Sequence, residues 1–542
     1  MPDGSVPDSS APDGSASDGS ALSPSPAGDR YGSTVTTTAP PSAAPTRERP
    51  AAGGRRATLV WSAALALGLA ALAAVAVWRL DGFVADDAFI TYRYARNLAA
   101  GEGWTYNPGE RTANAATSPL STVVLSGVAS VAGPEQLPGA GRVLAVLALS
   151  ATGLAVAGAL RQLGAALAGV LGGVLVVTNP WLVSTVGMET ALAAALGAGA
   201  VWAATARRQV TCGLLLGLAV LARPDSVLLA APLLFWLWWR ADFGTDVATR
   251  TGCVRGRGSR EARRVPWAGI ASMATVVLAW VPVALALGAE VLPATLAAKR
   301  AQTRSGLWGD GPLFLRGLVE LPGWLGFGPW AVVAAAAAVV GVVVGLRSQP
   351  LRGLTGVLCA FVGFHLAAYG LVLQPPAYHW YYGPELWVGS VTGGIALAAL
   401  AGVVGHRRSG VVAAVAATVV IAGLGLASVP GGYRYHHYDE VADWLAANTA
   451  PGATVAAAEV GVLGWRSGRP VVDHLGLLDP RAVAELDAGD LSSWLERRRP
   501  DYWVVHEPLW PHEAPAAATP YFRESYEPVL RTDGLTIYRR RP

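Results

Sequence analysis

Long apolar runs recur through most of this 542-residue chain, and several reach the ~20 residues that a helix needs to cross a bilayer. Inside a bilayer the backbone finds no water to bond, so only helices and closed barrels span it. With 52% hydrophobic and 14% charged residues, the chain is a polytopic, mainly α-helical membrane protein and not a soluble enzyme. The clearest runs are 57–77, 142–160, 165–182, 189–205, 266–288, 328–346, 353–373, 385–403 and 410–428.

Two other apolar stretches do not have the length of one crossing. The stretch 118–133 is short, and the stretch 211–239 is long and interrupted at Arg223-Pro224-Asp225. Either the first dips into the membrane without crossing it, or the second is one broken crossing. Both arrangements give about eleven crossings, and Arg207 and Arg208 favour the first.

Arginines between the apolar runs predict the orientation, because loops rich in Lys and Arg stay in the cytoplasm. The loop 240–264 is the strongest such marker, with Arg240, Arg250, Arg255, Arg257, Arg260, Arg263 and Arg264. Alternating from it places the N-terminus inside. The loops 81–117, 289–327 and 374–384, and everything after residue 428, then lie outside.

These features divide the chain into three expected parts. Residues 1–54 are rich in Pro, Ser, Gly, Asp and Ala, which cannot form a core, so they predict a disordered cytoplasmic tail. Residues 55–430 form the transmembrane domain, and residues 431–542 a soluble domain outside the membrane.

The last of these parts reads as a small α/β domain. Short apolar pieces at 455–459, 470–473 and 502–506 alternate with helix-like segments, as strands and helices do in such domains. Asp473 is expected to end a strand, and Asp479, followed by Pro480, to begin a helix.

An acidic pair, Asp86 and Asp87, follows the first apolar run at the outer surface of the membrane. Adjacent carboxylates repel one another, so a folded site keeps them with a cation, a hydrogen-bond donor or a proton-transfer task nearby. One Asp can serve as the cap of a short surface helix. The functional interpretation is a general base with its partner, or a site for a divalent cation such as Mg, Mn or Ca.

An aromatic loop follows that pair. Trp104 and Tyr106 lie just before an Asn107-Pro108-Gly109 turn. Their rings suit the membrane interface and equally suit stacking on sugar faces.

An ordered series of motifs extends from residue 57 to the C-terminus: DDAFITYRYARNL (86–98), GEGWTYNPGE (101–110), VGMET (186–190), LARPDS (221–226), LPATLAAK (292–299), VVDHLGLLDP (471–480) and PDYWVV (500–505). This series resembles the GT-C class of integral-membrane glycosyltransferases, and most of all the actinobacterial terminal β-(1→2)-arabinofuranosyltransferases. Residues 114–118 read Asn-Ala-Ala-Thr-Ser, where such enzymes often have Thr-Ser with an aromatic residue.

The resemblance implies an inverting transfer of arabinofuranose from decaprenyl-phosphoryl arabinofuranose to a cell-envelope arabinan such as arabinogalactan. It assigns the catalytic carboxylate to Asp86 or Asp87. One carboxylate would deprotonate the acceptor hydroxyl, and the lipid phosphate would leave as an anion that needs cations near it. The C-terminal region would help to hold the glycan acceptor.

Candidate partners of the donor phosphate are cations on the same side of the membrane: Arg93, Lys299, Arg300 and His379. For Lys299 and Arg300 the alternative is interfacial snorkelling, and for His379 it is a place in the aromatic belt.

Candidates for acceptor or sugar binding are Trp104, Tyr106, Glu189, Arg223, Asp225 and Tyr381. Ionisable groups at membrane depth are usually paired, so a structural Arg223–Asp225 pair is the alternative there.

Two other functions remain open. A polyprenyl-phosphate-mannose mannosyltransferase would share Asp86 and Asp87 and differ in its donor pocket. A membrane scaffold or transporter would need no catalytic carboxylate, although the ionisable residues gather on one side instead of lining a path through the spans. The modest net charge of +4 gives no reason to expect a nucleic-acid partner.

Overall fold

The computed structural model describes residues 52–110, 114–240, 265–403, 406–429 and 436–542. The expected tail up to residue 51 and the arginines from 241 to 264 lie outside the described residues. The chain divides into two compact units, residues 1–57 and 58–542, and everything below concerns the second.

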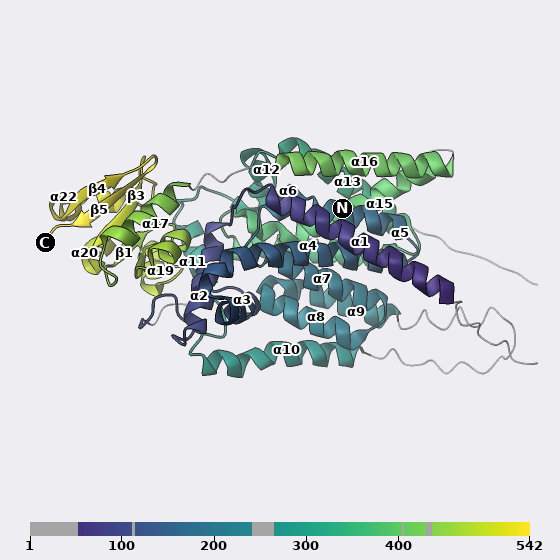
Figure 1. Cartoon of the computed structure of the whole chain (residues 1–542), viewed down its shortest axis with the longest axis horizontal. Coiled ribbons are helices and arrows are strands. Elements are labelled where there is room, and N and C mark those ends of the chain that lie inside the picture. Colours follow the sequence, from purple (N-terminus) through teal and green to yellow (C-terminus); the bar gives the residue numbers. More distant parts are fainter. Residues whose placement is uncertain (1–51, 111–113, 241–264, 404–405, 430–435) are drawn as a thin grey trace, which may run out of the picture. The chain divides into compact units, whose positions relative to one another are not determined.

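Helices dominate the chain, as the apolar runs predict (Figure 1). Within the described ranges, seven helical stretches are long and apolar enough to cross a membrane: Leu59–Trp78 in α1 (Ala52–Trp78), α4 (Leu137–Gln162) with the preceding 3-10 turn, α10 (Trp267–Ala286), α13 (Gly328–Arg347), α14 (Arg352–Ala367) with the π-helical turn Ala368–Leu373, α15 (Gly383–Val403) with the turn His379–Tyr382, and α16 (Arg407–Ser428). Four shorter apolar helices accompany them: α3 (Pro119–Ala132), α5 (Ala166–Val177), α7 (Thr190–Thr205) and α8 (Gln209–Ala222). The expected polytopic helical fold is confirmed.

The interrupted stretch around Arg223 forms a helical hairpin. After α8 the chain turns at Pro224–Ser226 and returns as α9 (Val227–Arg240). Gly269 of α10 lies against Gln209, at the start of α8, and against Leu234, in the middle of α9. The charge of Arg207, just before α8, also acts on Arg240 at the end of α9. The two helices are therefore antiparallel, and the Arg223 turn lies at their shared tip.

Helix α3 begins and ends at the same end of the bundle. The hydroxyl of Tyr94, in α2 (Asp86–Ala99), accepts a hydrogen bond from the Ala115 backbone just before α3. Shortly after α3, Arg142 of α4 donates to the Gly82 carbonyl, just before α2. Of the two predicted arrangements, the structure therefore has the first, in which 118–133 dips and 211–239 passes twice.

Close backbone approaches pack the bundle. Gly341 of α13 lies directly against the Thr392 backbone of α15, and Gly153 of α4 lies against Gly173 of α5. Without a hydrophobic driving force between helices in lipid, small residues that admit such contact are what hold spans together.

The C-terminal region forms a five-stranded sheet of order β2-β1-β3-β5-β4. The strands are β1 (Val455–Ala457), β2 (Val471–Asp473), β3 (Tyr502–His506), β4 (Tyr526–Arg531) and β5 (Leu535–Arg540), and the helices are α17 (His436–Asn448), α18 (Gly461–Ser467), α19 (Pro480–Asp487), α20 (Trp494–Arg498), α21 (Ala514–Ala517) and α22 (Pro520–Ser525). β1 pairs in parallel with β2 and β3, while β5 is antiparallel to β3 and β4. As predicted, Asp473 ends β2, and the Asp479 side chain caps α19.

The last two strands were not predicted. β4 contains Glu527, Pro528 and Arg531, and β5 ends in Arg539 and Arg540, so neither strand gives a long apolar run.

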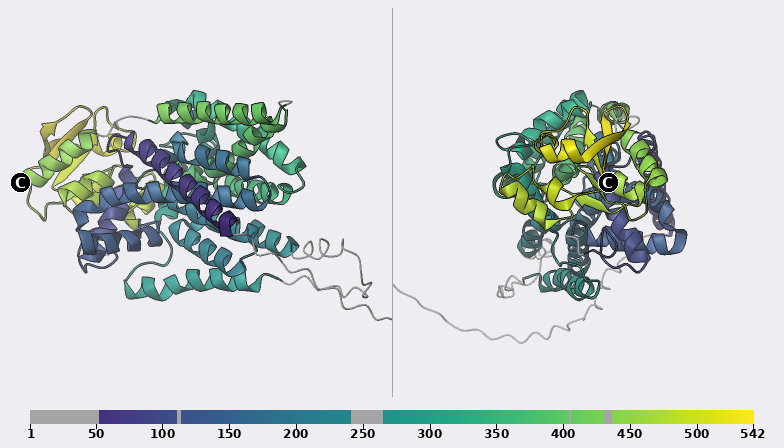
Figure 2. Two further views of the ribbon diagram at one scale, coloured as in Figure 1. Left: turned by 45° about the vertical axis from the view of Figure 1, so that its right-hand side comes forward. Right: turned by 90° about the vertical axis from the view of Figure 1, so that its left-hand side faces the viewer.

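The C-terminal region covers one end of the bundle, as the right-hand view of Figure 2 shows. The helix α2 and two further short helices, α11 (Thr295–Arg304) and α12 (Leu313–Trp324), lie in the segments between spans at this end. Gln302 of α11 donates to the Leu475 carbonyl, and Arg304 pairs with Asp487 of α19. The candidate site lies at this junction.

Candidate active site

Three carboxylates meet where α2 contacts the C-terminal region. One carboxylate oxygen each from Asp86, Asp87 and Glu459 lie within 4.8 Å of one another. Asp86 and Asp87 open α2, whereas Glu459 lies in the turn between β1 and α18. The site is therefore assembled from two segments far apart in sequence.

Asp86 is engaged by the main chain of α18. Its two carboxylate oxygens accept hydrogen bonds from the backbone N–H groups of Gly461, at 3.0 Å, and Val462, at 2.7 Å. The side chain is buried. It satisfies N–H groups that the first turn of a helix leaves without an intrahelical partner. The capping role considered from the sequence is thus present, but the capped helix belongs to the C-terminal region and not to α2.

Three side chains of the first loop hold the same segment. Arg93, 1% exposed, donates to the backbone carbonyls of Tyr106, Gly464 and Arg469, and to the Asn107 side chain. The Tyr106 hydroxyl donates to the Val460 carbonyl at 2.5 Å. Asn107 exchanges two hydrogen bonds with the backbone of Val471, like an extra residue at the edge of β2.

These contacts correct two expected roles. Arg93 donates its hydrogen bonds to other groups of the protein and is too deeply buried to serve as a phosphate ligand. Tyr106 is fully buried and cannot stack on a sugar. Trp104 is likewise buried, donates to the Asn114 side chain and packs against Trp280.

Lys299 supplies the cation of the site. Its ammonium nitrogen lies 4.1 Å from the centre of the Tyr378 ring, and its charge acts on Asp87 and Glu459. The side chain is 8% exposed and has no hydrogen-bond partner among the described residues. Asp87, half-buried, receives no hydrogen bond from the described part of the chain either. A buried ammonium with free donors beside a free carboxylate is poised to bind a polar ligand.

Burial raises the pKa values of all three carboxyls, and the charges of neighbouring carboxylates add to this for Asp86 and Glu459. Burial raises the pKa of Asp86 to about 6, against the backbone hydrogen bond from Val462, and the charge of Asp87 raises it further. Burial also raises the pKa of Asp87, which Lys299 opposes. The pKa of Glu459 lies well above its usual value because of burial and the charges of Asp86 and Asp87. The cluster therefore favours a ligand that brings a positive charge or hydrogen-bond donors.

A buried ion network lies next to the site, within the bundle. Arg223 pairs with Glu189 at 3.1 Å and with Asp225 at 3.0 Å. Asp225 also accepts a hydrogen bond from Tyr369 at 2.7 Å and lies 3.6 Å from His365. Arg223 and Asp225 thus form the structural ion pair that the sequence offered as an alternative to acceptor binding, and Glu189 is a third member of it.

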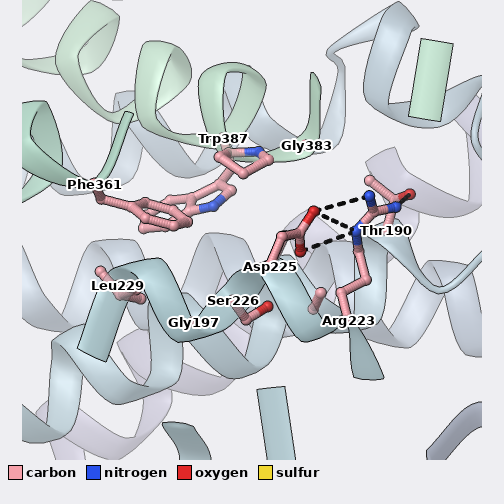
Figure 3. A pocket seen from close by; sticks show the side chains of 12 residues that line it. Thr190, Gly197, Arg223, Asp225, Ser226, Leu229, Phe361, Gly383 and Trp387 are labelled. Atoms are coloured by element: carbon pink, nitrogen blue, oxygen red, sulfur yellow. Dashed lines mark hydrogen bonds and ion pairs between the residues drawn. The ribbon is translucent and has the colours of Figure 1, made fainter. Parts of the chain in front are cut away.

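This network borders a small pocket among α7, α9, α14 and α15. Figure 3 shows Arg223 and Asp225 at one end and Phe361 and Leu229 at the other. The remaining lining is largely apolar, and Trp387 separates this pocket from a second, wholly apolar one deeper in the bundle. Arg223, Asp225 and Glu189 therefore pair with one another, and Glu189 also lies within reach of the charge of Asp87.

Of the remaining predicted residues, Tyr381 lies near both the ion network and the carboxylates, whereas His379 and Arg300 contact other parts of the chain. Tyr381 lies under the Arg223 guanidinium, 5.8 Å from it, and its hydroxyl group feels the charges of Lys299 and Asp87. The His379 ring contacts the Ser184 carbonyl at 3.2 Å. Arg300 points elsewhere and donates to the Val372 carbonyl at 3.4 Å.

The sequence analysis did not identify Glu459 or Tyr378 as site residues. Glu459 ends the apolar piece 455–459, where an acidic residue is an ordinary strand terminus. The available signal was its place at the carboxyl end of a parallel strand, where α/β sheets carry their ligands. Nothing local in the sequence connects it with Asp87.

Comparisons with known proteins bear on the fold. A family model described as a domain of unknown function (DUF8728) matches residues 430–539, which is the C-terminal region alone. No curated protein sequence matches the chain significantly.

Solved structures resemble nearly the whole chain. The structure of ArnT from Cupriavidus metallidurans bound to undecaprenyl phosphate matches with a TM-score of 0.54 and 14% identity over 90% of this chain and 98% of that chain. The Archaeoglobus fulgidus oligosaccharyltransferase tethered with an acceptor peptide matches with a TM-score of 0.51 and 12% identity, over 89% and 74%. At such identities the likeness concerns the fold, and it confirms that this chain is a multi-pass membrane protein with a GT-C-like architecture.

Proposed function

We propose that this protein is a glycosyltransferase that moves a sugar from a polyprenyl-phosphate donor to a glycan acceptor. The observation that carries the proposal is the pairing of Asp87, a carboxylate without a hydrogen bond from the described chain, with the buried Lys299 ammonium. A base and a phosphate-binding cation are the two groups that this reaction needs. The ArnT structure was determined with undecaprenyl phosphate, a ligand of the same chemical class.

In the proposed reaction, Asp87 removes the proton of an acceptor hydroxyl as that oxygen attacks the anomeric carbon. The new carbon–oxygen bond forms on the face opposite the phosphate, so the configuration inverts. The bond from the anomeric carbon to the phosphate oxygen breaks, and its electron pair leaves on the polyprenyl phosphate. Lys299 offsets the charge that develops there.

Asp87 suits the role of base better than Asp86. Both oxygens of Asp86 accept backbone hydrogen bonds, which hold the carboxylate in place and weaken its basicity toward a substrate. Asp87 is half-buried and has no such bonds from the described residues. A base must reach its proton within hydrogen-bonding distance, which favours the unengaged neighbour.

The sugar we propose is arabinofuranose, on the strength of the resemblance in the sequence motifs. The acceptor would be a cell-envelope arabinan. The cluster, the C-terminal region and the segments carrying Lys299 and Tyr378 lie at one end of the bundle, and we place that end outside the membrane because the arginine-rich loop 240–264 marks the other side.

A divalent cation fits the same residues. Asp86, Asp87 and Glu459 offer carboxylate oxygens within 4.8 Å of one another, the hard ligands that Mg, Mn and Ca prefer. A bound cation would supply positive charge for the departing phosphate. Lys299 already offers one positive charge at this place.

The test is sugar transfer by purified protein in detergent, with synthetic decaprenyl-phosphoryl arabinofuranose and polyprenyl-phosphoryl mannose as donors and an arabinan oligosaccharide as acceptor. We expect arabinose transfer by the wild type and a loss of about 10³-fold or more in Asp87→Asn, as for the removal of a general base. Each reaction is run with and without chelator. Loss of activity on chelation that Mn or Mg restores would establish the cation.

Three results would change the assignment. Transfer from the mannose donor alone would make the protein a mannosyltransferase. Full activity of Asp87→Asn would remove Asp87 from the mechanism. A folded wild type that uses neither donor would favour the scaffold or transporter.

A further inference from the structure

Glu459 reaches the active centre from the C-terminal region. It lies two residues after β1, the central strand of the three that run in parallel, at the edge where the carboxyl ends of these strands meet. Open α/β sheets hold ligands at this edge. Here the edge faces Asp86 and Asp87 of α2.

Main-chain contacts hold the turn that carries Glu459. Tyr106 bonds the Val460 carbonyl, and Asp86 bonds the N–H groups of Gly461 and Val462. Gly461 packs so closely that a Cβ atom there would lie 2.0 Å from the Asp86 backbone oxygen. The docking of α18 therefore rests mainly on its backbone. The Glu459 side chain adds one hydrogen bond to Asp86, which the amide of a glutamine could equally donate, so this contact does not call for a carboxylate at position 459.

A carboxylate at this position is unfavourable for folding alone. Glu459 is a third acid beside Asp86 and Asp87, and like charges so close cannot all ionise without cost. A glutamine would fit the same space without repulsion. Lys299 adjoins the cluster, over nine-tenths buried and without a hydrogen bond from the described residues, so a ligand is expected at this place.

We propose that Glu459 binds a hydroxyl group of the acceptor glycan, beside the hydroxyl that Asp87 deprotonates, so that the C-terminal region completes the active centre. The identity of the ligand rests on the proposed function. Carboxylates accept strong hydrogen bonds from hydroxyl groups. The groups that face Glu459 are Asp86 and Asp87 from α2, Lys299 from α11 and Tyr378 before α15, so the acceptor approaches from the C-terminal side and the donor phosphate from the Lys299 side.

The experiment measures binding, which does not depend on turnover. The affinities of an arabinofuranose oligosaccharide, a mannose oligosaccharide and decaprenyl phosphate are determined for the wild type, Glu459→Gln and Glu459→Asp. We expect Glu459→Gln to weaken binding of one oligosaccharide by about 10- to 100-fold, the size of a lost charged hydrogen bond, and to leave decaprenyl phosphate within about twofold. Glu459→Asp should recover part of the affinity. Glu440→Gln, the same change at an exposed site of α17, serves as the control.

Several outcomes would overturn the proposal. These are equal oligosaccharide binding by wild type and Glu459→Gln, an equal loss of oligosaccharide and decaprenyl phosphate, and a wild type that binds neither oligosaccharide. The two proposals can fail separately. Glycan binding that depends on Glu459, without any sugar transfer, would contradict the transferase function and support the role of Glu459. Sugar transfer that Glu459→Gln leaves unchanged would support the transferase function and contradict the role of Glu459.

Discussion

At the scale of single residues, adjacent side chains of the same type carry different tasks. Asp86 caps a helix of the C-terminal region, and Asp87 has no hydrogen bond from the described residues. Lys299 and Arg300 differ in the same way. Lys299 adjoins the carboxylates, whereas Arg300 donates a hydrogen bond to the distant Val372 carbonyl. In each pair the neighbour is a natural control for the other.

The first prediction concerns Lys299. Lys299→Gln removes the ammonium beside Asp87, and we expect the apparent KM for the polyprenyl-phosphate donor to rise about 10- to 100-fold, because a charged hydrogen bond to phosphate is lost. Steady-state kinetics with varied donor measures the effect. Arg300→Gln should change the same KM less than about threefold. Equal effects of the two variants would contradict the assignment.

The second prediction concerns pH. The folded state raises the pKa of Glu459 well above 4.5 and that of Asp86 to about 6, so it favours their neutral forms. Their contribution to stability is therefore complete below about pH 4 and is lost as the pH rises through the folded-state pKa values. Glu459→Gln removes one of the two, which should make it more stable than wild type at pH 7.5 by about 1 kcal/mol and no more stable at pH 4.

Melting temperatures of detergent-purified protein in chelator, measured from pH 4 to 8, would test this. A difference between variant and wild type that stays constant with pH would show that Glu459 does not titrate as described.

At the scale of elements, the junction between α2 and α18 determines whether the site exists. Arg93, Tyr106 and Asp86 all bond the backbone of 460–469, and they belong to the first loop of the membrane part. The geometry of the C-terminal region is thus fixed by side chains that come from between the spans.

The third prediction tests that junction. Gly461→Ala would place a methyl group 2.0 Å from the backbone oxygen of Asp86, which cannot give way as a side chain would. We expect α18 to lose its packing against α2 and the free energy of unfolding to fall by about 2 kcal/mol or more. Amide hydrogen exchange over residues 455–467 should rise strongly. Gly452→Ala, where a methyl group meets nothing within 4 Å, should leave exchange unchanged.

The fourth prediction concerns the ion network that joins α7, the α8–α9 hairpin and α14. Its partners are at most 8% exposed, so Arg223→Gln leaves Asp225 and Glu189 buried without their cation. We expect a loss of about 3–5 kcal/mol. The exposed Arg316–Glu320 pair gives the comparison, because Arg316→Gln should cost less than about 1 kcal/mol. Thermal unfolding followed by size-exclusion chromatography would report both, and similar values would contradict the network's structural role.

At the scale of the whole molecule, the described site residues gather at one end of the helix bundle, under the C-terminal sheet. This arrangement suits a reaction between a lipid-linked donor in the membrane and a polar acceptor in water. We expect this end to lie outside the membrane, because the arginine-rich loops mark the cytoplasmic side.

The fifth prediction tests that direction. With Cys212, Cys253 and Cys359 replaced by serine, single cysteines are introduced at Ala488, exposed in the C-terminal region, and at Gln349, exposed between α13 and α14. A membrane-impermeant maleimide applied to intact cells should label Ala488→Cys and spare Gln349→Cys until the cells are permeabilised. The opposite pattern would invert the topology.

The sequence alone determined the membrane class and the spans, because the length and apolarity of a crossing helix are local properties that the bilayer imposes. The GT-C-like fold was indicated by the resemblance of the motifs to a known class. The sequence also singled out Asp86 and Asp87 by their position. Only the tertiary structure decided which polar residues bond other parts of the protein and which are left without a hydrogen bond from the described residues. Asp86 meets Gly461 across 375 positions of sequence, and Glu459, Arg93 and Tyr106 acquire their surroundings through the same contact. Such contacts depend on how two separately formed segments dock, and no periodicity or spacing within either segment encodes that docking.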